Sequence, residues 1–245
     1  MRSRRRARVK RDSLNHAQRK DQLGTRRNFI KCGLVGLIGL GLSAGRLLSH
    51  PHCAWAGTGK TIVPKGTKQD DLRNKNPRDL DTSSLEITPI KDFGTMGLDD
   101  YDVDIEKWRL LVEGEVAAPL SLSYDQVINL ACIERTVLMI CPGVFVNNGV
   151  WKGVPLKELL KMAQVKPDVN YVTFRGPMGN YEKAFRSPIQ EALADKVFLA
   201  YHVNGRRLPR KHGFPLRLVA EGYHGYEWVK YVYKVTADVI KEEER

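Results

Sequence analysis

The positive charge of this sequence is concentrated at its N-terminus, and this division limits where a folded domain can lie. Residues 1–56 contain 13 Lys and Arg residues against 2 Asp and Glu residues, whereas the remainder is almost balanced, with 27 against 26. The formal net charge of +12 therefore belongs almost entirely to the N-terminal segment. Because the body of the chain has no excess positive charge to pair with phosphates, a nucleic-acid-binding function is not expected.

The first 56 residues have the order of parts of an export signal. A basic run precedes the pair Arg26-Arg27, a glycine-interrupted apolar stretch runs from Cys32 to Gly45, and Ala54-Trp55-Ala56 resembles a cleavage site. The apolar stretch is too short for the ~20 apolar residues that a membrane-spanning helix needs. The arginine pair and the Asn-Phe-Ile that follows it resemble the signal of the twin-arginine pathway.

This resemblance implies that the Tat translocase exports the chain, already folded, to the periplasm or another extracytoplasmic compartment. We expect a twin-arginine signal peptide over residues 1–56, with cleavage near Ala56. The alternative is an uncleaved N-terminal anchor, for which Arg46 could mark the boundary. Removal of the signal would leave Cys132 and Cys141, which could form a disulfide or have separate roles.

Beyond the signal, the pattern predicts one α+β domain. Residues 57–87 are polar and turn-rich and are expected to be an extended arm or linker, residues 88–240 have a globular pattern, and residues 241–245 are a charged tail. Strands and short helices alternate irregularly, which predicts a mixed sheet. We expect strands at 108–114, 136–140, 171–174, 197–203, 216–219 and 228–235, and helices from the cap Ser123 to Leu130, from Pro155 to Met162 and from Pro188 to Ala194.

Cys141 is the first candidate for chemistry. It follows the apolar strand that ends at Ile140 and precedes Pro142-Gly143, so a turn would expose the sulfur at the strand end. A metal ligand, a nucleophile, a small buried side chain and a disulfide with Cys132 all fit this placement.

A second pattern lies between residues 204 and 230. Cationic side chains surround two glycine-containing turns: His212 and Arg217 flank Gly213-Phe214-Pro215, and Lys230 follows a second glycine-rich segment. Cations beside turns where backbone N–H groups can approach closely suit a ligand that carries phosphate.

Together these residues resemble the molybdopterin-binding core of the sulfite oxidase family. The resemblance rests on Cys141 together with four runs of sequence: Ala200-Tyr201-His202-Val203-Asn204-Gly205, His212-Gly213-Phe214-Pro215-Leu216-Arg217-Leu218-Val219, Trp228-Val229-Lys230 and Trp151-Lys152-Gly153-Val154-Pro155-Leu156. It covers roughly residues 88–239. Within the family, the chain looks closest to the branch of the periplasmic protein-methionine-sulfoxide reductase catalytic subunit, because Asp92-Phe93-Gly94-Thr95 is similar to a pterin-contacting segment there.

The resemblance implies a sulfite oxidase-type fold and a molybdenum-molybdopterin cofactor. Cys141 would bind molybdenum and serve as the catalytic ligand. The residues implied to bind the pterin are Asp92, Phe93, His212, Arg217, Trp228, Val229 and Lys230. Gly176 falls where the branch has another pterin contact, but its side chain differs and it is left out.

The departures from the family affect the substrate more than the cofactor. Where sulfite oxidases have an Arg-Asn-His segment and an arginine after the cysteine, this chain has Phe93-Gly94-Thr95 and Pro142-Gly143-Val144-Phe145. The branch's asparagine is replaced by His212, and its Asn-to-Glu pterin loop reads Thr88 to Asp92. The family's C-terminal dimerisation domain has no counterpart before Arg245, so a monomer is expected.

We therefore predict an exported oxidoreductase that transfers oxygen atoms, with reduction of S- or N-oxides favoured over a sulfite dehydrogenase-like activity. A small molecule or a sulfoxide would be the substrate, and a cytochrome or membrane haem protein would exchange electrons. Two alternatives come from other classes: a metal-free redox or nucleophilic cysteine with His202 or His224 as base, and a binding module without catalysis.

Overall fold

The computed structural model describes residues 59–99, 101–177 and 183–241. The export signal that the sequence predicts lies outside these residues. In the part of the chain that the structure describes, no helix is long and apolar enough to cross a membrane.

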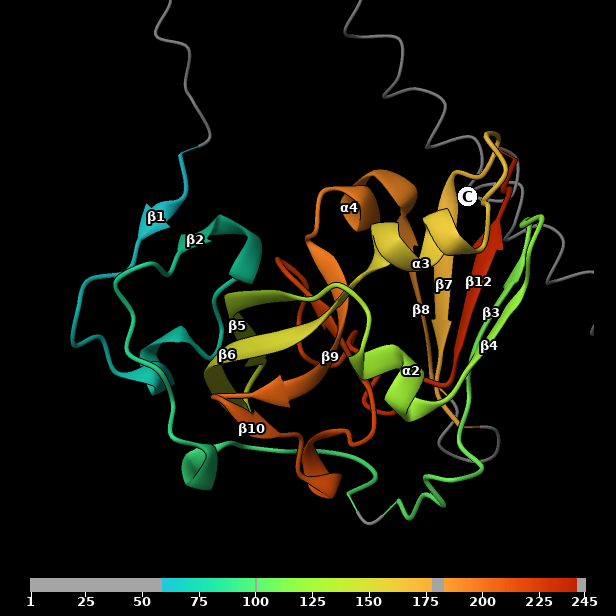
Figure 1. The fold of residues 1–245 in the computed structure, drawn as a ribbon. Coiled ribbons are helices and arrows are strands. Elements are labelled where there is room, and N and C mark those ends of the chain that lie inside the picture. The colour runs from blue at the N-terminus through green and yellow to red at the C-terminus, as the bar shows by residue number, and fades with distance from the viewer. Residues whose placement is uncertain (1–58, 100, 178–182, 242–245) are drawn as a thin grey trace, which may run out of the picture. The chain divides into compact units, whose positions relative to one another are not determined.

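Two five-stranded sheets carry the fold (Figure 1). The first sheet is antiparallel throughout, with β9 pairing with three of the other strands. Its strands are β5 (Ile133–Cys141), β6 (Phe145–Pro155), β9 (Val197–Val203), β10 (Arg206–Arg207) and β11 (Arg217–Ala220).

The second sheet has the order β4-β3-β12-β7-β8 and is mixed, because β12 is parallel to β3 while the other pairs are antiparallel. The mixed character predicted from the sequence is confirmed in this sheet. Its strands are β3 (Leu110–Gly114), β4 (Leu120–Leu122), β7 (Tyr171–Arg175), β8 (Ala184–Pro188) and β12 (Lys234–Asp238).

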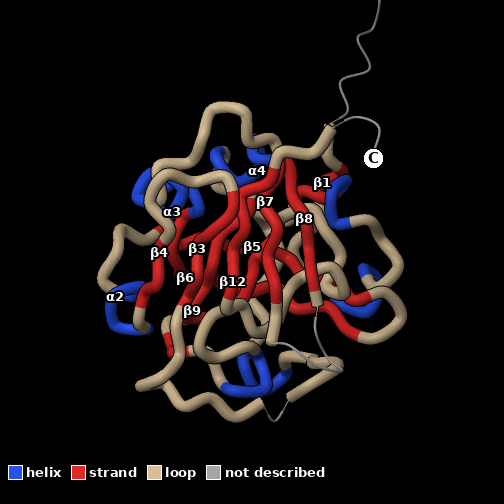
Figure 2. Tube along the Cα trace, turned by 90° about the vertical axis from the view of Figure 1, so that its right-hand side faces the viewer, coloured by secondary structure: helices blue, strands red, loops and turns tan. Residues whose placement is uncertain are grey.

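Three short helices lie at the periphery, and the strands fill the centre (Figure 2). They are α2 (Tyr124–Ile128), α3 (Leu156–Met162) and α4 (Ile189–Leu193), close to the predicted ranges. The start of α2 is fixed by a capping box, in which the Ser123 side chain accepts from the Gln126 backbone and the Gln126 side chain accepts from the Ser123 backbone. Such a box satisfies two N–H groups that the first helical turn leaves unbonded.

The apolar end of β5 is buried on both faces, which explains its unbroken hydrophobic run. Val137 and Met139 belong to the main core, whereas Leu138 and Ile140 belong to a second cluster that includes Val146. Side chains alternate between the two faces of a strand, so a continuous apolar run requires cover on both sides.

Residues 59–87 supply that second cover. This segment is extended and contains only short elements, including the parallel pair β1 (Thr61–Ile62) and β2 (Leu80–Asp81). Four of its buried side chains, Val63, Leu72, Leu80 and Leu85, belong to the second cluster. Burial of an aliphatic side chain contributes roughly 1.5–3 kcal/mol, so these contacts hold the segment on β5 and β6 although its composition is polar.

The strand predicted at 228–235 is wrong over residues 228–233. The structure has a strand only from Lys234, because the preceding residues bond to two different sheets. The Val229 carbonyl accepts from Leu218 N of β11, and Val232 N donates to the Leu216 carbonyl just before that strand. Tyr233 instead bonds with residues of β3 and β7. A segment that passes from one sheet to the other cannot maintain a single ladder.

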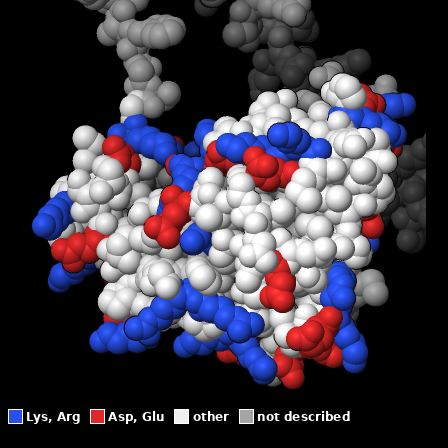
Figure 3. Space-filling model, in the orientation of Figure 1, with Lys and Arg blue, Asp and Glu red and all other residues white. Residues whose placement is uncertain are grey.

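The surface charges of the described residues are mixed (Figure 3). Lys and Arg gather along the lower edge of that view, where β10 lies in Figure 1, and elsewhere acidic groups lie among them. Exposed cations occur on β10 and on the 3₁₀ turn η4 (Arg210–His212), where Arg210 forms an ion pair with Asp102 at 2.8 Å.

Candidate functional site

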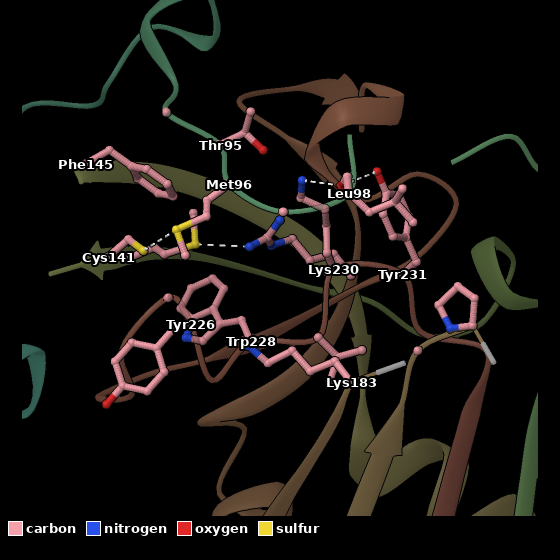
Figure 4. Close-up of a pocket in the computed structure, with 18 residues that line it drawn as sticks. Thr95, Met96, Leu98, Cys141, Phe145, Lys183, Tyr226, Trp228, Lys230 and Tyr231 are labelled. Carbon is pink, nitrogen blue, oxygen red and sulfur yellow. Dashed lines mark hydrogen bonds between the residues drawn. The ribbon is translucent and has the colours of Figure 1, made fainter. Parts of the chain in front are cut away.

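A solvent-open hollow of about 820 Å³ lies where the end of β5 meets residues 94–98 and 225–231. Figure 4 shows Cys141 at one side of this pocket, residues 94–98 across its top, and Lys183 and Tyr226 on the opposite side from that loop. We call it the Cys141 pocket.

The alternation of side chains on β5 brings Cys141 into the pocket. Met139 and Cys141 share one face of the strand, and both line the pocket. The strand then ends in a turn, in which Val144 N donates to the Cys141 carbonyl at 3.0 Å and Gly143 has φ +73°. Proline second and a positive-φ glycine third are typical of a type II turn, so the Pro142-Gly143 pair fixes the sulfur at the strand end.

Cys141 is buried, with 3% of its surface exposed, and its Sγ lies 3.7 Å from Met96 Sδ. Burial raises the pKa of the thiol, and the nearby positive charges of Lys183 and Arg217 oppose that rise. The free thiol is therefore protonated at neutral pH, whereas coordination of a metal ion would deprotonate it.

An intramolecular disulfide between Cys141 and Cys132 is excluded by the strand between them. Both cysteines are free, with Cys132 exposed just before β5 and Cys141 its last residue. Nine residues of strand at about 3.3 Å each separate the two by ~30 Å, whereas a disulfide requires Cα atoms within about 7 Å.

Arg217 is a buried cation without a carboxylate partner in the described part of the chain. Its Nη1 donates to the His212 carbonyl at 3.0 Å, its Nη2 contacts Met139 Sδ at 3.1 Å, and its buried Nε has no partner. The guanidinium lies 5.7 Å from the rings of Trp151 and Trp228. Burial lowers the pKa of Arg217 to about 10, and only the weakly acidic Tyr231 and Cys141 oppose that change. A buried guanidinium with no carboxylate partner and an unbonded Nε favours the binding of an anion in the pocket.

A close approach at Gly213 joins the two motifs of the C-terminal third. A Cβ at this position would lie 2.3 Å from the Lys230 carbonyl oxygen, and the residue has φ +112°. Glycine therefore lets the turn after His212 pack directly on the segment that carries Lys230. This packing places Arg217 and Lys230 in one pocket although 13 positions separate them in the sequence.

Lys183 and Lys230 add two further cations. Lys230 Nζ donates to the Leu98 carbonyl at 2.6 Å, and burial together with the charge of Arg217 lowers its pKa to about 8. Burial and Arg217 also lower the pKa of Lys183. Three cations and no Asp or Glu line the pocket, so its electrostatics suit a ligand with negative charge.

Five of the residues predicted from the sequence line the Cys141 pocket: Cys141, Arg217, Trp228, Val229 and Lys230. Two other predicted residues, His212 and Phe93, do not line the pocket but are buried and contact each other. His212 is 2% exposed, its ring contacts the Phe93 ring edge-on at 5.7 Å, and its Nε2 has no partner. Burial, with the charges of Lys211, Arg217 and Lys230, lowers the pKa of His212 to about 4, so its ring is neutral at neutral pH.

Asp92 is not brought to the pocket. It ends the 3₁₀ turn η3 (Ile90–Asp92) with its side chain exposed, while the next residue, Phe93, points into the core. The 3₁₀ turn therefore directs the side chain of Asp92 to the solvent and that of Phe93 to the core, and the sequence motif alone does not reveal this difference.

Sequence reasoning missed several residues that line the pocket. Met96 and Lys183 come from separate segments that carry no motif, and Tyr226 lies in the glycine-rich segment before Lys230 but was not predicted to be a site residue. Gly176 lines the pocket although its lack of a side chain argued against it. The glycines at 94 and 97 were the available signal for the loop that carries Met96.

The donor atoms limit the kind of metal site that is possible. Among the described residues there is no group of three or more His, Cys, Asp or Glu side chains that could hold a metal ion. A metal at Cys141 would therefore have one protein thiolate and would need its other ligands from a bound organic group. Soft sulfur donors from such a group, together with unpaired cations for its phosphate, fit this pocket.

Comparison with known proteins indicates a bound group of the same kind. Residues 97–244 match the family model described as the oxidoreductase molybdopterin binding domain. Nitrate reductase [NADH] 2 of Nicotiana tabacum is 30% identical over 161 residues, covering 53% of this chain and 18% of that protein. Nitrate reductase [NADH] of Volvox carteri is 28% identical over 165 residues, covering 55% and 19%. The chain thus spans about a fifth of the length of these relatives.

Among solved structures, the sulfane dehydrogenase SoxCD of Paracoccus pantotrophus shares the fold, with a TM-score of 0.55 and 22% identity over 82% of this chain and 57% of that chain. This likeness fits the α+β sulfite oxidase-type fold predicted from the sequence. From the matched domain and the architecture, the chain belongs to the oxidoreductase molybdopterin-binding domain family, and its cofactor is molybdenum-molybdopterin.

Proposed function

We propose that the Cys141 pocket binds the molybdenum cofactor and that the chain uses it to reduce S- or N-oxides after export. The observation that carries this proposal is the combination of one buried thiol with the unpaired guanidinium of Arg217 in a single hollow. Cys141 would bind the metal, while Arg217 and Lys230 would hold the anionic phosphate of the pterin.

When bound, the molybdenum cofactor supplies two-electron oxygen-atom transfer. The residues of the chain have the remaining tasks. The Cys141 thiolate is a soft donor to the metal, Arg217 and Lys230 neutralise the phosphate, and Trp228 and Phe145 restrict water at the thiol side of the pocket.

The mouth of the pocket supports an oxide with apolar substituents. Met96 and Tyr226 are about half exposed, and with Phe145 they surround the opening near Cys141. The sequence lacks the sulfite-binding arginine after the cysteine, because Val144 and Phe145 occupy that stretch. The resemblance to the protein-methionine-sulfoxide reductase branch points to the same class of substrate.

The holoenzyme should reduce a dialkyl or aryl sulfoxide with an artificial electron donor at least about tenfold more efficiently, in kcat/KM, than it oxidises sulfite. The expected difference follows from the missing charged contacts to the sulfite anion, since loss of a polar contact to the substrate commonly lowers kcat/KM by about tenfold or more. The measurement is steady-state kinetics on protein with determined molybdenum and pterin content. Efficient sulfite oxidation at micromolar concentration would instead favour a sulfite dehydrogenase-like activity.

Two alternatives of other classes have less support. A metal-free cysteine nucleophile needs a thiolate and a nearby base, but burial raises the pKa of Cys141, and neither His202 nor His224 lines the pocket. A binding module without catalysis would contain no molybdenum after expression in a host supplied with molybdate, so metal content separates it from our proposal.

Export also remains a proposal, and it rests on Arg26-Arg27 and the residues that follow the pair. Replacing both arginines by Lys should leave a full-length precursor in the cytoplasm, because the twin-arginine signal depends on the pair rather than on its charge. Fractionation and mass determination of wild type and variant measure this effect. Normal export and processing of the double variant would remove the twin-arginine assignment.

Turnover moves two electrons and requires an electron partner. A cytochrome or a membrane haem protein stays our prediction for that partner, as does a monomeric state for the exported chain.

A further inference from the structure

Lys183 is the charged residue of the Cys141 pocket that neither sequence motif includes. It directly precedes β8, and its backbone position is fixed because Gly176 N donates to the Lys183 carbonyl at 2.8 Å. Its half-buried side chain lines the pocket on the side opposite residues 94–98 (Figure 4).

The ammonium group of Lys183 makes no hydrogen bond or ion pair with the described residues. Lys230 differs in this respect, because its ammonium donates to the Leu98 carbonyl at 2.6 Å. A half-buried cation has lost part of its hydration, and no hydrogen bond replaces the lost water contacts of Lys183, so its ammonium can donate to a polar ligand that enters.

Lys183 lines the same pocket as the Cys141 thiol. Among the charged groups that act on the Cys141 thiol, Lys183 has the largest effect, followed by Arg217, and both lower the pKa that burial raises. Burial and the charge of Arg217 lower the pKa of Lys183, and the carboxylate of Glu227, which does not line the pocket, opposes that fall.

Apolar side chains line the pocket together with Lys183 and Cys141. Tyr226 and Lys183 both lie on the side of the pocket opposite residues 94–98, with Trp228 between them, while Met96 approaches Cys141 from the loop above it (Figure 4). A hydrogen-bond donor among apolar side chains can recognise a molecule with one strongly polar oxygen and apolar substituents.

We infer that Lys183 is a substrate-binding residue, whose ammonium donates a hydrogen bond to the oxygen of an S- or N-oxide while Met96, Phe145 and Tyr226 contact its substituents. This inference rests on the proposed function of the pocket. The S–O and N–O oxygens of such oxides carry a large partial negative charge, which a desolvated ammonium stabilises more than a neutral donor would.

The test compares wild-type holoenzyme with Lys183→Gln, Lys183→Met and Lys183→Arg, with Lys161→Gln as control. Lys161 is exposed on α3, outside the pocket. Loss of a charge-assisted hydrogen bond should lower kcat/KM for methyl p-tolyl sulfoxide by about ten- to a hundredfold in the Gln and Met variants. Lys183→Arg should recover part of the loss, and Lys161→Gln should resemble wild type.

Two measurements distinguish a role in substrate binding from a role in cofactor binding. Molybdenum and pterin content should stay at the wild-type level in all four variants, because Arg217 and Lys230 hold the phosphate. Dimethyl sulfone has the same kind of S–O oxygen, but we expect no turnover of it. Its binding should quench tryptophan fluorescence in wild type. Its affinity should fall in Lys183→Gln and Lys183→Met by a factor similar to the loss in kcat/KM.

Unchanged kinetics and unchanged sulfone binding in both variants would overturn the inference. Loss of pterin from them would also overturn it, by assigning Lys183 to the cofactor. If wild type reduces no oxide, the proposed function fails, but the sulfone titration still decides whether Lys183 binds such an oxygen.

Discussion

Cys141→Ser should abolish turnover while the protein stays folded. If the sulfur completes the coordination of molybdenum, serine replaces a soft, strongly donating ligand by a harder oxygen, and the ligand field and potential of the metal change. We expect the rate to fall by more than about a hundredfold, beyond the ten- to hundredfold losses seen when outer partners of metal ligands are mutated.

The fold should tolerate this change because the two side chains are similar in size. Burying a hydroxyl in place of a thiol at the end of β5 should cost about 1 kcal/mol, or roughly 2–4 °C in melting temperature for a chain of this length. Pterin content should persist, since Arg217 and Lys230 would hold the phosphate independently of the metal ligand.

Cys132→Ser is the matched control. Cys132 is exposed at the other end of the same strand, so its substitution should change neither activity nor melting temperature. Activity with an artificial donor, molybdenum content and thermal unfolding should be measured on both variants. A Cys141→Ser protein with wild-type activity would refute the assignment of the metal ligand.

Arg217→Ala should remove most of the bound pterin. The guanidinium is buried, has an unpartnered Nε and lies where no carboxylate of the described residues neutralises it. A charge-assisted contact to phosphate commonly contributes 1.5–3 kcal/mol, so pterin occupancy under limiting conditions should fall by about tenfold or more. Arg217→Lys should keep part of the occupancy, because lysine keeps the charge but lacks the planar pair of donors.

The apoprotein of this variant should remain folded. Alanine removes contacts with Trp151, Trp228 and Met139, but it also removes an unpaired charge from the interior, and the two effects oppose one another. Arg206→Ala, on the exposed hairpin strand β10, is the control for a general effect of lost positive charge. Pterin content by fluorescence after oxidation, together with circular dichroism, measures both outcomes. Full occupancy in a soluble Arg217→Ala protein would remove Arg217 from the cofactor site.

Local signals in the sequence predicted the helices α2, α3 and α4 and about half of the strands, but they did not predict the long strand β6 or the partners to which the strands bond. The helix that Ser123 caps and the strand that ends at Asn204-Gly205 were predicted because caps and hairpin turns depend on neighbouring residues. The strand predicted from Trp228 was wrong because the segment passes from one sheet to the other, and sheet pairing is a long-range property. The burial of Leu72 and Leu80 under β5 and β6 was missed for the same reason.

By itself, the sequence determined the parts of the site that depend on short runs of residues. The apolar strand and the Pro142-Gly143 turn place Cys141 at a strand end, and the glycine after His212 permits the close packing that positions Arg217. The tertiary structure decided the rest. It exposed Asp92, and it brought Met96, Lys183 and Tyr226 around the thiol from segments up to 130 positions apart. Such contacts arise from how the two sheets pack, and no pattern in one segment specifies which side chain of another will lie opposite.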